Sequence, residues 1–241
     1  RYSEIMRPYM KNIGGLGLDM MHRSCTVQAN FDYISELDMQ KKIRVSAALQ
    51  PIVTGLFANS PFLDGNISGY LSYRGFVWTR TDKDRTGILK SMIEKNFSFE
   101  EYVDYALKVP VYSIIRNGKH INCLDYNFED LMNNRFSQIQ SIDLTLDDWT
   151  DHLSTIFTDV RLKTYIEMRG ADAGRYKSLC ALPAFWTGIL YCPDCLDEAI
   201  SIINKWNYED IINLRKSVCK IGLDAEINNQ NGWEIAEQFL K

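Results

Sequence analysis

Histidine is scarce in this sequence, and its few positions suit no common catalytic arrangement. The three histidines, His22, His120 and His152, lie far apart and beside no convincing serine or cysteine partner. A nucleophile–histidine–acid triad is therefore not expected. The sequence also lacks the Gly-x-Ser-x-Gly motif of α/β-hydrolases and the glycine-rich lysine motif of P-loop proteins. These absences argue against two large classes of enzyme.

Cysteine is also sparse, and the six residues are too few for a disulfide scaffold at this length. We therefore expect free thiols in a reducing cytoplasm. The pair in "CPDC", Cys192 and Cys195, has no second pair and few histidines nearby, which argues against zinc. It is expected to open a helix, where the dipole favours thiolates. A structural pair and a redox pair both fit, and the sequence favours the structural one.

The chain has no apolar run of the roughly 18 residues that a membrane helix needs, and no signal peptide. Its net charge of −4 is mild, so we expect neither a membrane nor a nucleic-acid partner. Without repeats or low-complexity linkers, residues 1–241 are expected to form a single domain. The first residue is arginine rather than methionine, which points to a processed, trimmed or incomplete N-terminus.

What the sequence does contain is a mixture of strand and helix signals. Strand formers alternate with other residues over 24–33 and 161–172, and Asn117-Gly118 between two apolar runs predicts a β-hairpin. Pro51 and Pro183 are expected to bend or break their helices. Antiparallel strands with segregated helices predict an α+β fold rather than a doubly wound one. Helical periodicity, with caps at Ser35, Ser98 and Thr145, predicts helices over residues 35–59, 98–110, 127–134, 145–157, 176–191, 197–206 and 208–218.

Glu167 and Arg169 stand two residues apart in "YIEMRGAD", so in a strand they share one face. Two solvent-facing charges would explain the pattern. A metal–phosphate site would also explain it, because a carboxylate binds Mg²⁺ and an arginine binds phosphate oxygens. The strand over 24–33 has a polar face that includes Gln28 and Asn30. If the two strands share a sheet, their polar faces line one cavity.

A turn-rich segment over residues 60–87 is expected to be a long loop, and such loops are uncommon unless functional. In its second half, "SYRGFVWTRTDKDRTG", Arg74, Arg80 and Arg85 alternate with aspartates and lie close to Trp78. A salt-bridged surface loop and an anion-binding loop both fit this pattern. The guanidinium fork matches a carboxylate or a phosphate.

Eight longer stretches follow one another along the chain: "CTVQANFDY", "SELDMQKKIRVSAALQPI", "LFANSPFLDG", "WTRTDKDRTG", "EEYVDYALKVP", "LSTIF", "VRLKTYIEMRGADAG" and "LCALPAFWTGILY". Together, from about Gly14 to about Tyr191, they resemble the glutamate–cysteine ligase family of the plant and proteobacterial type. The resemblance implies a fold like that of glutamine synthetase, in which an antiparallel sheet forms the active-site cavity and helices surround it.

The resemblance also implies an activity. Members use ATP and Mg²⁺ to phosphorylate the γ-carboxyl of L-glutamate, and the amine of L-cysteine then attacks the acyl phosphate. The product is γ-glutamylcysteine, the first intermediate of glutathione synthesis. Such chemistry needs clustered carboxylates for metal ions, cations for the moving phosphoryl group, and a clamp for the glutamate carboxylate.

The resemblance assigns roles to residues of the two strands. Glu167 resembles, by its position in the motif, a metal ligand of the family. Arg169 resembles in the same way the catalytic cation that faces the nucleotide phosphate. Gln28 and Asn30 lie on the strand that faces ATP and metal in this superfamily, so they are expected to bind nucleotide.

It also assigns roles in the arginine-rich segment. Arg74 is similar to the catalytic glutamate clamp, with Trp78 and Arg85 expected on the same wall of the substrate site. Arg80 departs from the family, because an acidic residue is expected there.

A second departure is larger. The family carries a "GTEHEK"-like acidic strand that supplies much of the metal site, and this sequence has no such segment. Residues 1–241 are therefore expected to be the C-terminal part of the catalytic domain, which acts with a missing N-terminal segment or as a homodimer. Two alternatives remain open: a γ-glutamyl ligase with another amine acceptor, and a non-catalytic fragment.

Overall fold

The computed structural model describes residues 1–94, 97–135 and 143–240. Its longest helix, α3 (Glu36–Leu56), begins at Ser35, whose Oγ accepts a hydrogen bond of 3.2 Å from the Asp38 amide, as the capping pattern predicts. The helix continues through Pro51 without a break. Most of its residues beyond the first turn are buried, so α3 is the centre of the main core.

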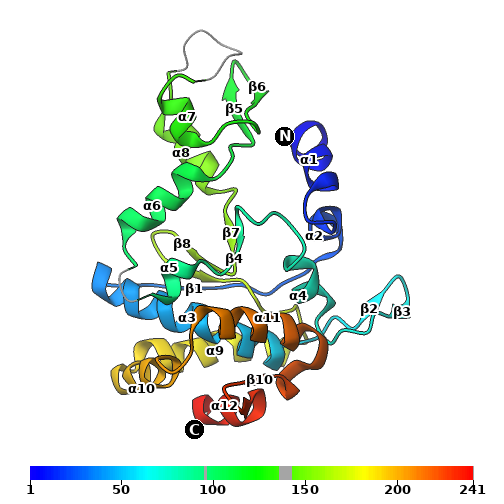
Figure 1. Cartoon of the computed structure of the whole chain (residues 1–241), viewed down its shortest axis with the longest axis vertical. Coiled ribbons are helices and arrows are strands. Elements are labelled where there is room, and N and C mark those ends of the chain that lie inside the picture. The colour runs from blue at the N-terminus through cyan, green and yellow to red at the C-terminus, as the bar shows by residue number, and fades with distance from the viewer. Residues whose placement is uncertain (95–96, 136–142, 241) are drawn as a thin grey trace.

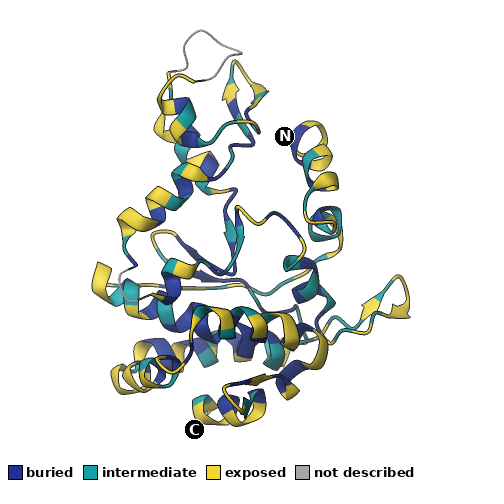
Figure 2. Ribbon diagram, viewed as in Figure 1, coloured by how far each residue is buried: buried dark blue, intermediate teal, exposed yellow. Residues whose placement is uncertain are grey.

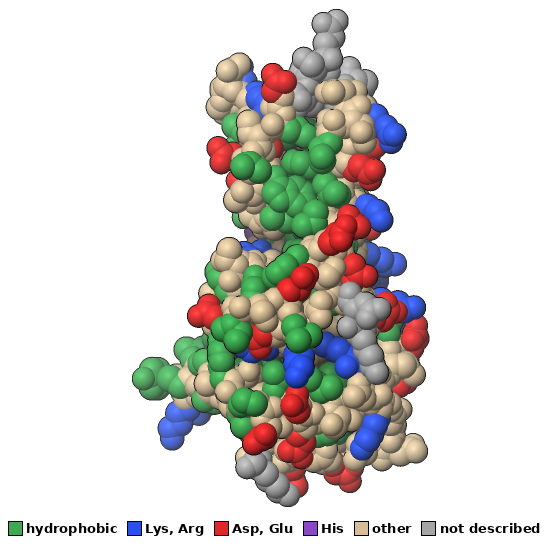
Figure 3. Space-filling view, turned by 90° about the vertical axis from the view of Figure 1, so that its left-hand side faces the viewer, with side chains coloured by type: hydrophobic (Ala, Val, Ile, Leu, Met, Phe, Trp, Pro, Cys, Tyr) green, Lys and Arg blue, Asp and Glu red, His purple; other side chains and the backbone are tan. Residues whose placement is uncertain are grey.

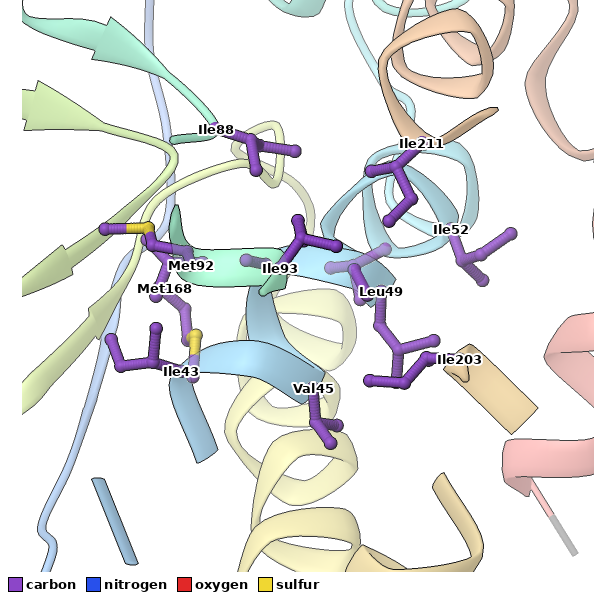
Figure 4. Close-up of a cluster of buried hydrophobic side chains, with 14 of the residues drawn as sticks. Ile43, Val45, Leu49, Ile52, Ile88, Met92, Ile93, Met168, Ile203 and Ile211 are labelled. Carbon is purple, nitrogen blue, oxygen red and sulfur yellow. The ribbon is translucent and has the colours of Figure 1, made fainter. Parts of the chain in front are cut away.

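Four helices surround α3 at one end of the long molecular axis (Figure 1): α9 (Tyr176–Tyr191), α10 (Pro193–Ile203), α11 (Tyr208–Ile221) and α12 (Gly232–Leu240). Pro183 lies within α9, which is also continuous. Figure 4 shows apolar side chains of α3, among them Ile43 and Leu49, beside Met168, Ile203 and Ile211. A short 3-10 turn η2 (Gly222–Asp224) and the hairpin β10 (Glu226–Ile227) and β11 (Gln230–Asn231) connect α11 to α12.

A three-stranded antiparallel sheet packs on α3 in the order β1 (Ala29–Phe31), β9 (Ile166–Met168), β8 (Val160–Leu162). The prediction of one strand over 161–172 is wrong, because the chain reverses at residues 163–165 and pairs β8 with β9. The strand predicted over 24–33 is shorter than expected, although an isolated bridge joins Thr26 to Asp172. These pairings confirm that the two predicted strands share one sheet.

The segment over 60–87 is not the long loop that the sequence predicts. It contains the hairpin β2 (Phe62–Leu63) and β3 (Asn66–Ile67), the helix α4 (Tyr73–Trp78) and the strand β4 (Thr86–Gly87). Ser72 begins α4, because its Oγ accepts a hydrogen bond of 2.9 Å from the Gly75 amide. β4 pairs in parallel with β7 (Phe157–Thr158), so the C-terminal end of the segment is held by a strand from a distant part of the chain.

A smaller apolar cluster lies at the other end of the long axis (Figure 1). It lies among α6 (Phe99–Lys108), α7 (Phe128–Met132), α8 (Leu146–Leu153) and the hairpin β5 (Ser113–Arg116) and β6 (Lys119–Asn122). The predicted caps at Ser98 and Thr145 are confirmed, and so is the hairpin, with positive φ at Asn117 and Gly118. The π-helix η1 (Tyr2–Met6) and helices α1 (Arg7–Asn12), α2 (Gly17–Arg23) and α5 (Lys90–Ile93) complete the chain.

Figure 2 shows the buried residues, in dark blue, as patches on the elements that meet at these clusters. On the face shown in Figure 3, apolar side chains gather over the half that carries α6, α7 and α8. A groove of about 550 Å³ opens between α6, α8 and the β8–β9 turn, lined in part by Val103, Trp149 and Tyr165. The described elements leave this groove uncovered.

The architecture confirms an α+β fold of helices with small, mostly antiparallel sheets. A single cavity-forming sheet of the glutamine-synthetase kind stays a prediction. Within the described ranges, no single helix is long and apolar enough to cross a membrane. Only α9 and α10, which meet at 91°, reach that length and composition when taken together.

His152 of α8 gives a prediction for the pH dependence of stability. Its Nε2 lies 2.8 Å from the Ala106 carbonyl oxygen, and burial lowers its pKa to about 4. As pH falls below about 6.5, His152 binds a proton in the unfolded chain but not in the folded one. Proton binding therefore favours the unfolded chain and lowers the free energy of unfolding. We expect the free energy of unfolding to lose roughly 2 kcal/mol more between pH 6.5 and 4.5 than it loses in His152→Gln. Urea unfolding across this range measures the difference; equal losses would contradict the assignment.

Candidate active site

The candidate site lies where the chain leaves β9 and meets α4. Arg74, in the first turn of α4, donates from Nη1 to the Gly170 carbonyl at 3.0 Å and from Nη2 to the Arg169 carbonyl at 2.5 Å. The side chain is buried, and burial lowers the pKa of the guanidinium to about 10 against the opposing effect of Asp172 and Asp159. Its Nε has no hydrogen-bond partner among the described residues, so one buried donor is available to a ligand.

Trp78 lies close to two guanidinium groups. The Cζ of Arg74 lies 5.6 Å from the centre of its ring and the Cζ of Arg169 lies 5.9 Å from it, distances at which cations and aromatic rings attract. Like the Nε of Arg74, the Nε1 of Trp78 is buried and unpaired within the described part of the chain. Buried donors without acceptors are costly, so both atoms fit a ligand with acceptor oxygens.

Glu167 is held by two arginines rather than standing free. Its Oε2 accepts from Arg161 Nε at 2.8 Å and from Arg169 Nη1 at 2.7 Å. The strand register explains this, because Arg161 stands directly opposite Glu167 across the β8–β9 pair and so points to the same face. Burial raises the pKa of Glu167, but the hydrogen bond from Arg169 and the charge of Arg161 outweigh it, so the pKa lies below its usual value.

This arrangement bears on the expected magnesium site. Mg²⁺ prefers several oxygen ligands, usually carboxylates, waters and phosphates. Within the described residues, no group of three or more histidine, cysteine, aspartate or glutamate side chains is placed to hold a metal ion. Glu167 offers only its second oxygen, Oε1. The described residues therefore do not form a magnesium centre on their own, and the role of Glu167 as a metal ligand stays a prediction.

The expected nucleotide-binding pair lies beside this carboxylate. Asn30 stands opposite Glu167 across the β1–β9 pair, and Gln28 lies two residues before it; both side chains are exposed. The polar faces of the two strands therefore meet, as the sequence predicts. The other face of the predicted strand over 24–33 is buried only in part: Phe31 is buried, but Cys25 is exposed.

Arg85 does not share the wall formed by Arg74 and Trp78, and this corrects the expectation that it does. It is fully buried and pairs with Asp82, donates to Thr155 Oγ1 at 3.1 Å and to the Pro110 carbonyl at 2.8 Å, and stacks 3.9 Å from the centre of the Tyr112 ring. Its donors are committed to these protein partners, so the geometry gives Arg85 a structural role. Arg80, in contrast, is exposed.

Two acidic residues that the sequence did not single out position the site. Asp172 is buried and accepts from the Asn59 amide at 2.8 Å, from Ser60 Oγ at 2.7 Å and from Ser72 Oγ at 2.9 Å. Ser60 Oγ in turn accepts from the Arg74 amide at 3.0 Å. Asp172 therefore ties the end of β9 to the start of α4. The second residue is Asp159, which accepts two hydrogen bonds from Arg215 of α11.

Together these side chains form what we call the arginine cluster. Its four arginines and three carboxylates leave an excess of one positive charge in a buried environment, which favours an anionic ligand. A small, partly open space of about 20 Å³, enough for a water molecule, lies against Arg74, Trp78, Asp159, Arg169 and Arg215. The members of the cluster are Arg74, Arg161, Arg169, Arg215, Asp159, Glu167 and Asp172.

Replacing Arg215 with lysine tests the contribution of its forked geometry. Lysine keeps the charge but cannot make two parallel hydrogen bonds to Asp159, so we expect a loss of about 1–2 kcal/mol in the free energy of unfolding. The exposed Arg175 is a matched control, and Arg175→Lys should leave stability within about 0.5 kcal/mol of the parent. Equal effects of the two substitutions in urea unfolding would mean that the pair contributes nothing specific.

Comparison with known proteins gives one family for most of the chain. Residues 1–236 match the profile of glutamate-cysteine ligase family 2. The chain is 49% identical over 238 residues to "Glutamate--cysteine ligase, chloroplastic" of Nicotiana tabacum, covering 99% of this chain and 46% of that protein. It is 48% identical to "Glutamate--cysteine ligase B, chloroplastic" of Oryza sativa subsp. japonica, covering 99% and 48%. It is 47% identical to "Glutamate--cysteine ligase, chloroplastic" of Arabidopsis thaliana, and the match covers 99% of this chain and 46% of that protein.

Three statements follow from the relatives and the family profile. The chain spans about half the length of the curated relatives it matches. All three are named as chloroplastic, so the expectation of a cytoplasmic enzyme is wrong. The match over 236 of 241 residues shows that this chain belongs to glutamate-cysteine ligase family 2.

Proposed function

We propose that this chain forms part of an enzyme that joins the γ-carboxyl of L-glutamate to the amine of L-cysteine with consumption of ATP. The product would be γ-glutamylcysteine, the first intermediate of glutathione synthesis. Family membership supports the reaction class. The single observation that carries the proposal is the pair of buried, unpaired donors, Arg74 Nε and Trp78 Nε1, inside a cluster with excess positive charge.

In this proposal, the residues have separate roles in binding glutamate, stabilising charge and positioning Arg169. Arg74 and Trp78 bind a carboxylate of glutamate through their free N–H groups, because these donors are already buried and oriented. Arg169 faces the γ-carboxyl and stabilises the negative charge that develops when a phosphoryl group moves from ATP to that oxygen. The cysteine amine then attacks the acyl carbon, and phosphate leaves. Glu167 and Arg161 keep the Arg169 guanidinium in place.

ATP and Mg²⁺ belong to the proposal through the resemblance to the family. Asn30 and Gln28 are the proposed contacts for the nucleotide, since they are exposed on the strand beside Glu167. The metal would take most of its ligands from outside the described residues, either from a further segment or from a second copy of the chain. The three-stranded sheet would then be one wall of a glutamine-synthetase-like cavity. Following the names of its relatives, we place the enzyme in the plastid.

A second candidate function has one observation in its favour. The described residues contain no acidic cluster for a metal, which suits a fragment that binds glutamate but completes no reaction by itself. Calorimetric titration separates the two candidates. The proposed enzyme should bind ATP more tightly with Mg²⁺ than without it when the chain is joined to the tobacco half that it does not span. A non-catalytic fragment should show no metal-dependent binding in either form.

The amine acceptor is tested in the same joined protein. Under our proposal, L-cysteine should support ATP hydrolysis and product formation better than other amino acids and simple amines offered at equal concentration. Preference for another amine would replace the acceptor while keeping the γ-glutamyl chemistry. Loss of L-glutamate dependence would contradict the proposed function as a whole.

A further inference from the structure

The Cys192–Cys195 pair lies at the junction of α9 and α10, outside the arginine cluster. α9 ends at Tyr191 and α10 begins at Pro193, and the two helices meet at 91°. Cys192 is the N-cap of α10, and its Sγ accepts a hydrogen bond of 3.4 Å from the Cys195 amide. The side chain of Cys192 is therefore directed towards residue 195 at the start of an 11-residue helix.

The spacing of the pair suits a disulfide. Residues three apart at a helix start are neighbours, with roughly 5–6 Å between Cβ atoms, and modest movement brings two such sulfurs to bonding distance. Both thiols are accessible, since Cys195 is exposed and Cys192 is half-buried. An open groove of about 400 Å³ is lined by Pro193 and Leu196, the chain neighbours of the two cysteines, although neither cysteine lines it.

The two thiols differ in a way that gives them different roles. Hydrogen bonds from the Cys195 thiol and then from the Cys195 amide lower the pKa of Cys192, and the same contact raises the pKa of Cys195. The start of α10 adds the positive end of a helix dipole. By contrast, burial raises the pKa of Cys123 to about 11 and that of Cys219 to about 12, which makes those thiols unreactive.

We propose that Cys192 and Cys195 form a redox-active dithiol that exchanges with small disulfides. The Cys192 thiolate attacks one sulfur of a disulfide, forms a mixed disulfide and releases one thiolate. The Cys195 sulfur then attacks Cys192 Sγ, closes the Cys192–Cys195 disulfide and releases the second thiolate. Two electrons pass from the protein dithiol to the disulfide, and the two released thiolates take up the protons that the cysteines lose.

Alkylation and redox titration of the whole chain test the proposal. At pH 7 we expect iodoacetamide to modify Cys192 at least about threefold faster than the exposed Cys25 and Cys180. Equilibration with 2-hydroxyethyl disulfide and 2-mercaptoethanol, followed by alkylation and peptide mass spectrometry, should show a disulfide between Cys192 and Cys195. No disulfide should involve Cys25 or Cys180.

Three variants make the outcome decisive. Cys192→Ser should fold, because serine is a good N-cap, and should lose both fast alkylation and the disulfide. Cys195→Ser should keep the reactive Cys192 and accumulate its mixed disulfide with 2-mercaptoethanol. Cys180→Ser should behave as the parent. Alkylation of Cys192 no faster than that of Cys180, together with no intramolecular disulfide in excess 2-hydroxyethyl disulfide, would overturn the proposal. None of these readouts depends on ligase activity, so the result is independent of the proposed function.

Discussion

Replacing Asp172 with asparagine is expected to lower the free energy of unfolding by about 3 kcal/mol, because hydrogen bonds to a buried charged group are among the strongest single contributions. Its carboxylate accepts three hydrogen bonds, from the Asn59 amide and from the hydroxyls of Ser60 and Ser72. Asparagine presents an NH₂ group to donors that need an acceptor. Urea unfolding measures the loss, and Asp104→Asn on the exposed side of α6 is the control, with an expected change below about 0.5 kcal/mol.

The same substitution should also affect the site. Asp172 reaches Arg74 through Ser60, and it holds Ser72, the N-cap of α4. Movement of α4 would displace Arg74 and Trp78 without removing either. We therefore expect the KM for L-glutamate of the joined enzyme to rise while the KM for ATP stays near that of the parent. Equal changes in both constants would show a general loss of structure rather than a positioning role.

Replacing Arg74 with lysine is expected to weaken binding of L-glutamate by roughly 10- to 100-fold, the range for hydrogen bonds to a charged partner. Lysine keeps the charge, but its single nitrogen cannot take the separate positions of Nη1 and Nη2, which hold the Gly170 and Arg169 carbonyls, and of Nε, which is left for a ligand. Arg80→Lys is the matched control, because Arg80 lies six residues further along the chain, and is exposed. Calorimetry with L-glutamate measures the difference.

Unfolding measurements are needed as a control for the Arg74→Lys binding test. Arg74 is buried, so Arg74→Lys will also destabilise the chain, and binding has to be compared at a temperature where both variants are folded. If folded Arg74→Lys binds L-glutamate as tightly as Arg80→Lys does, Arg74 is not the carboxylate clamp. The unpaired Nε of Arg74 would then need another ligand.

The sequence predicts local structure well where a side chain acts on its own backbone. Ser35, Ser98 and Thr145 cap helices because a hydroxyl three residues before a free amide finds it without help from the rest of the fold. Asn117-Gly118 forms a hairpin turn for the same local reason, since both residues accept positive φ.

Tertiary contacts explain where prediction from the sequence ends. The reversal at residues 163–165 has no glycine–asparagine signal, and pairing with β1 and packing on α3 decide it. Arg74 and Arg85 both lie in the arginine-rich segment, yet Asp82, Thr155 and Tyr112 surround Arg85, whereas Arg74 keeps a donor with no partner among the described residues. Arg215 lies on an amphipathic helix, so the sequence predicts a surface residue. Its ion pair with Asp159, which is distant in the sequence, appears only in the folded structure.

The buried charges also explain why Glu167 and Arg169 share one strand face. In the described structure they pair with each other, and Arg161 completes the group. Taking these charges out of water is costly, and replacing such a group with apolar side chains often stabilises a protein. A cluster that keeps an excess of positive charge despite this cost fits a binding role better than a stabilising one.

The most direct test of the central claim is product formation by the chain joined to the half of the tobacco protein that it does not span. We predict that ATP, L-glutamate and L-cysteine give γ-glutamylcysteine, detected by mass spectrometry. We also predict that Arg169→Met lowers the rate about 100-fold or more, as expected when a donor to developing charge is removed, whereas the exposed control Arg175→Met does not. Equal rates in Arg169→Met and Arg175→Met would contradict the assignment of the arginine cluster as the active site.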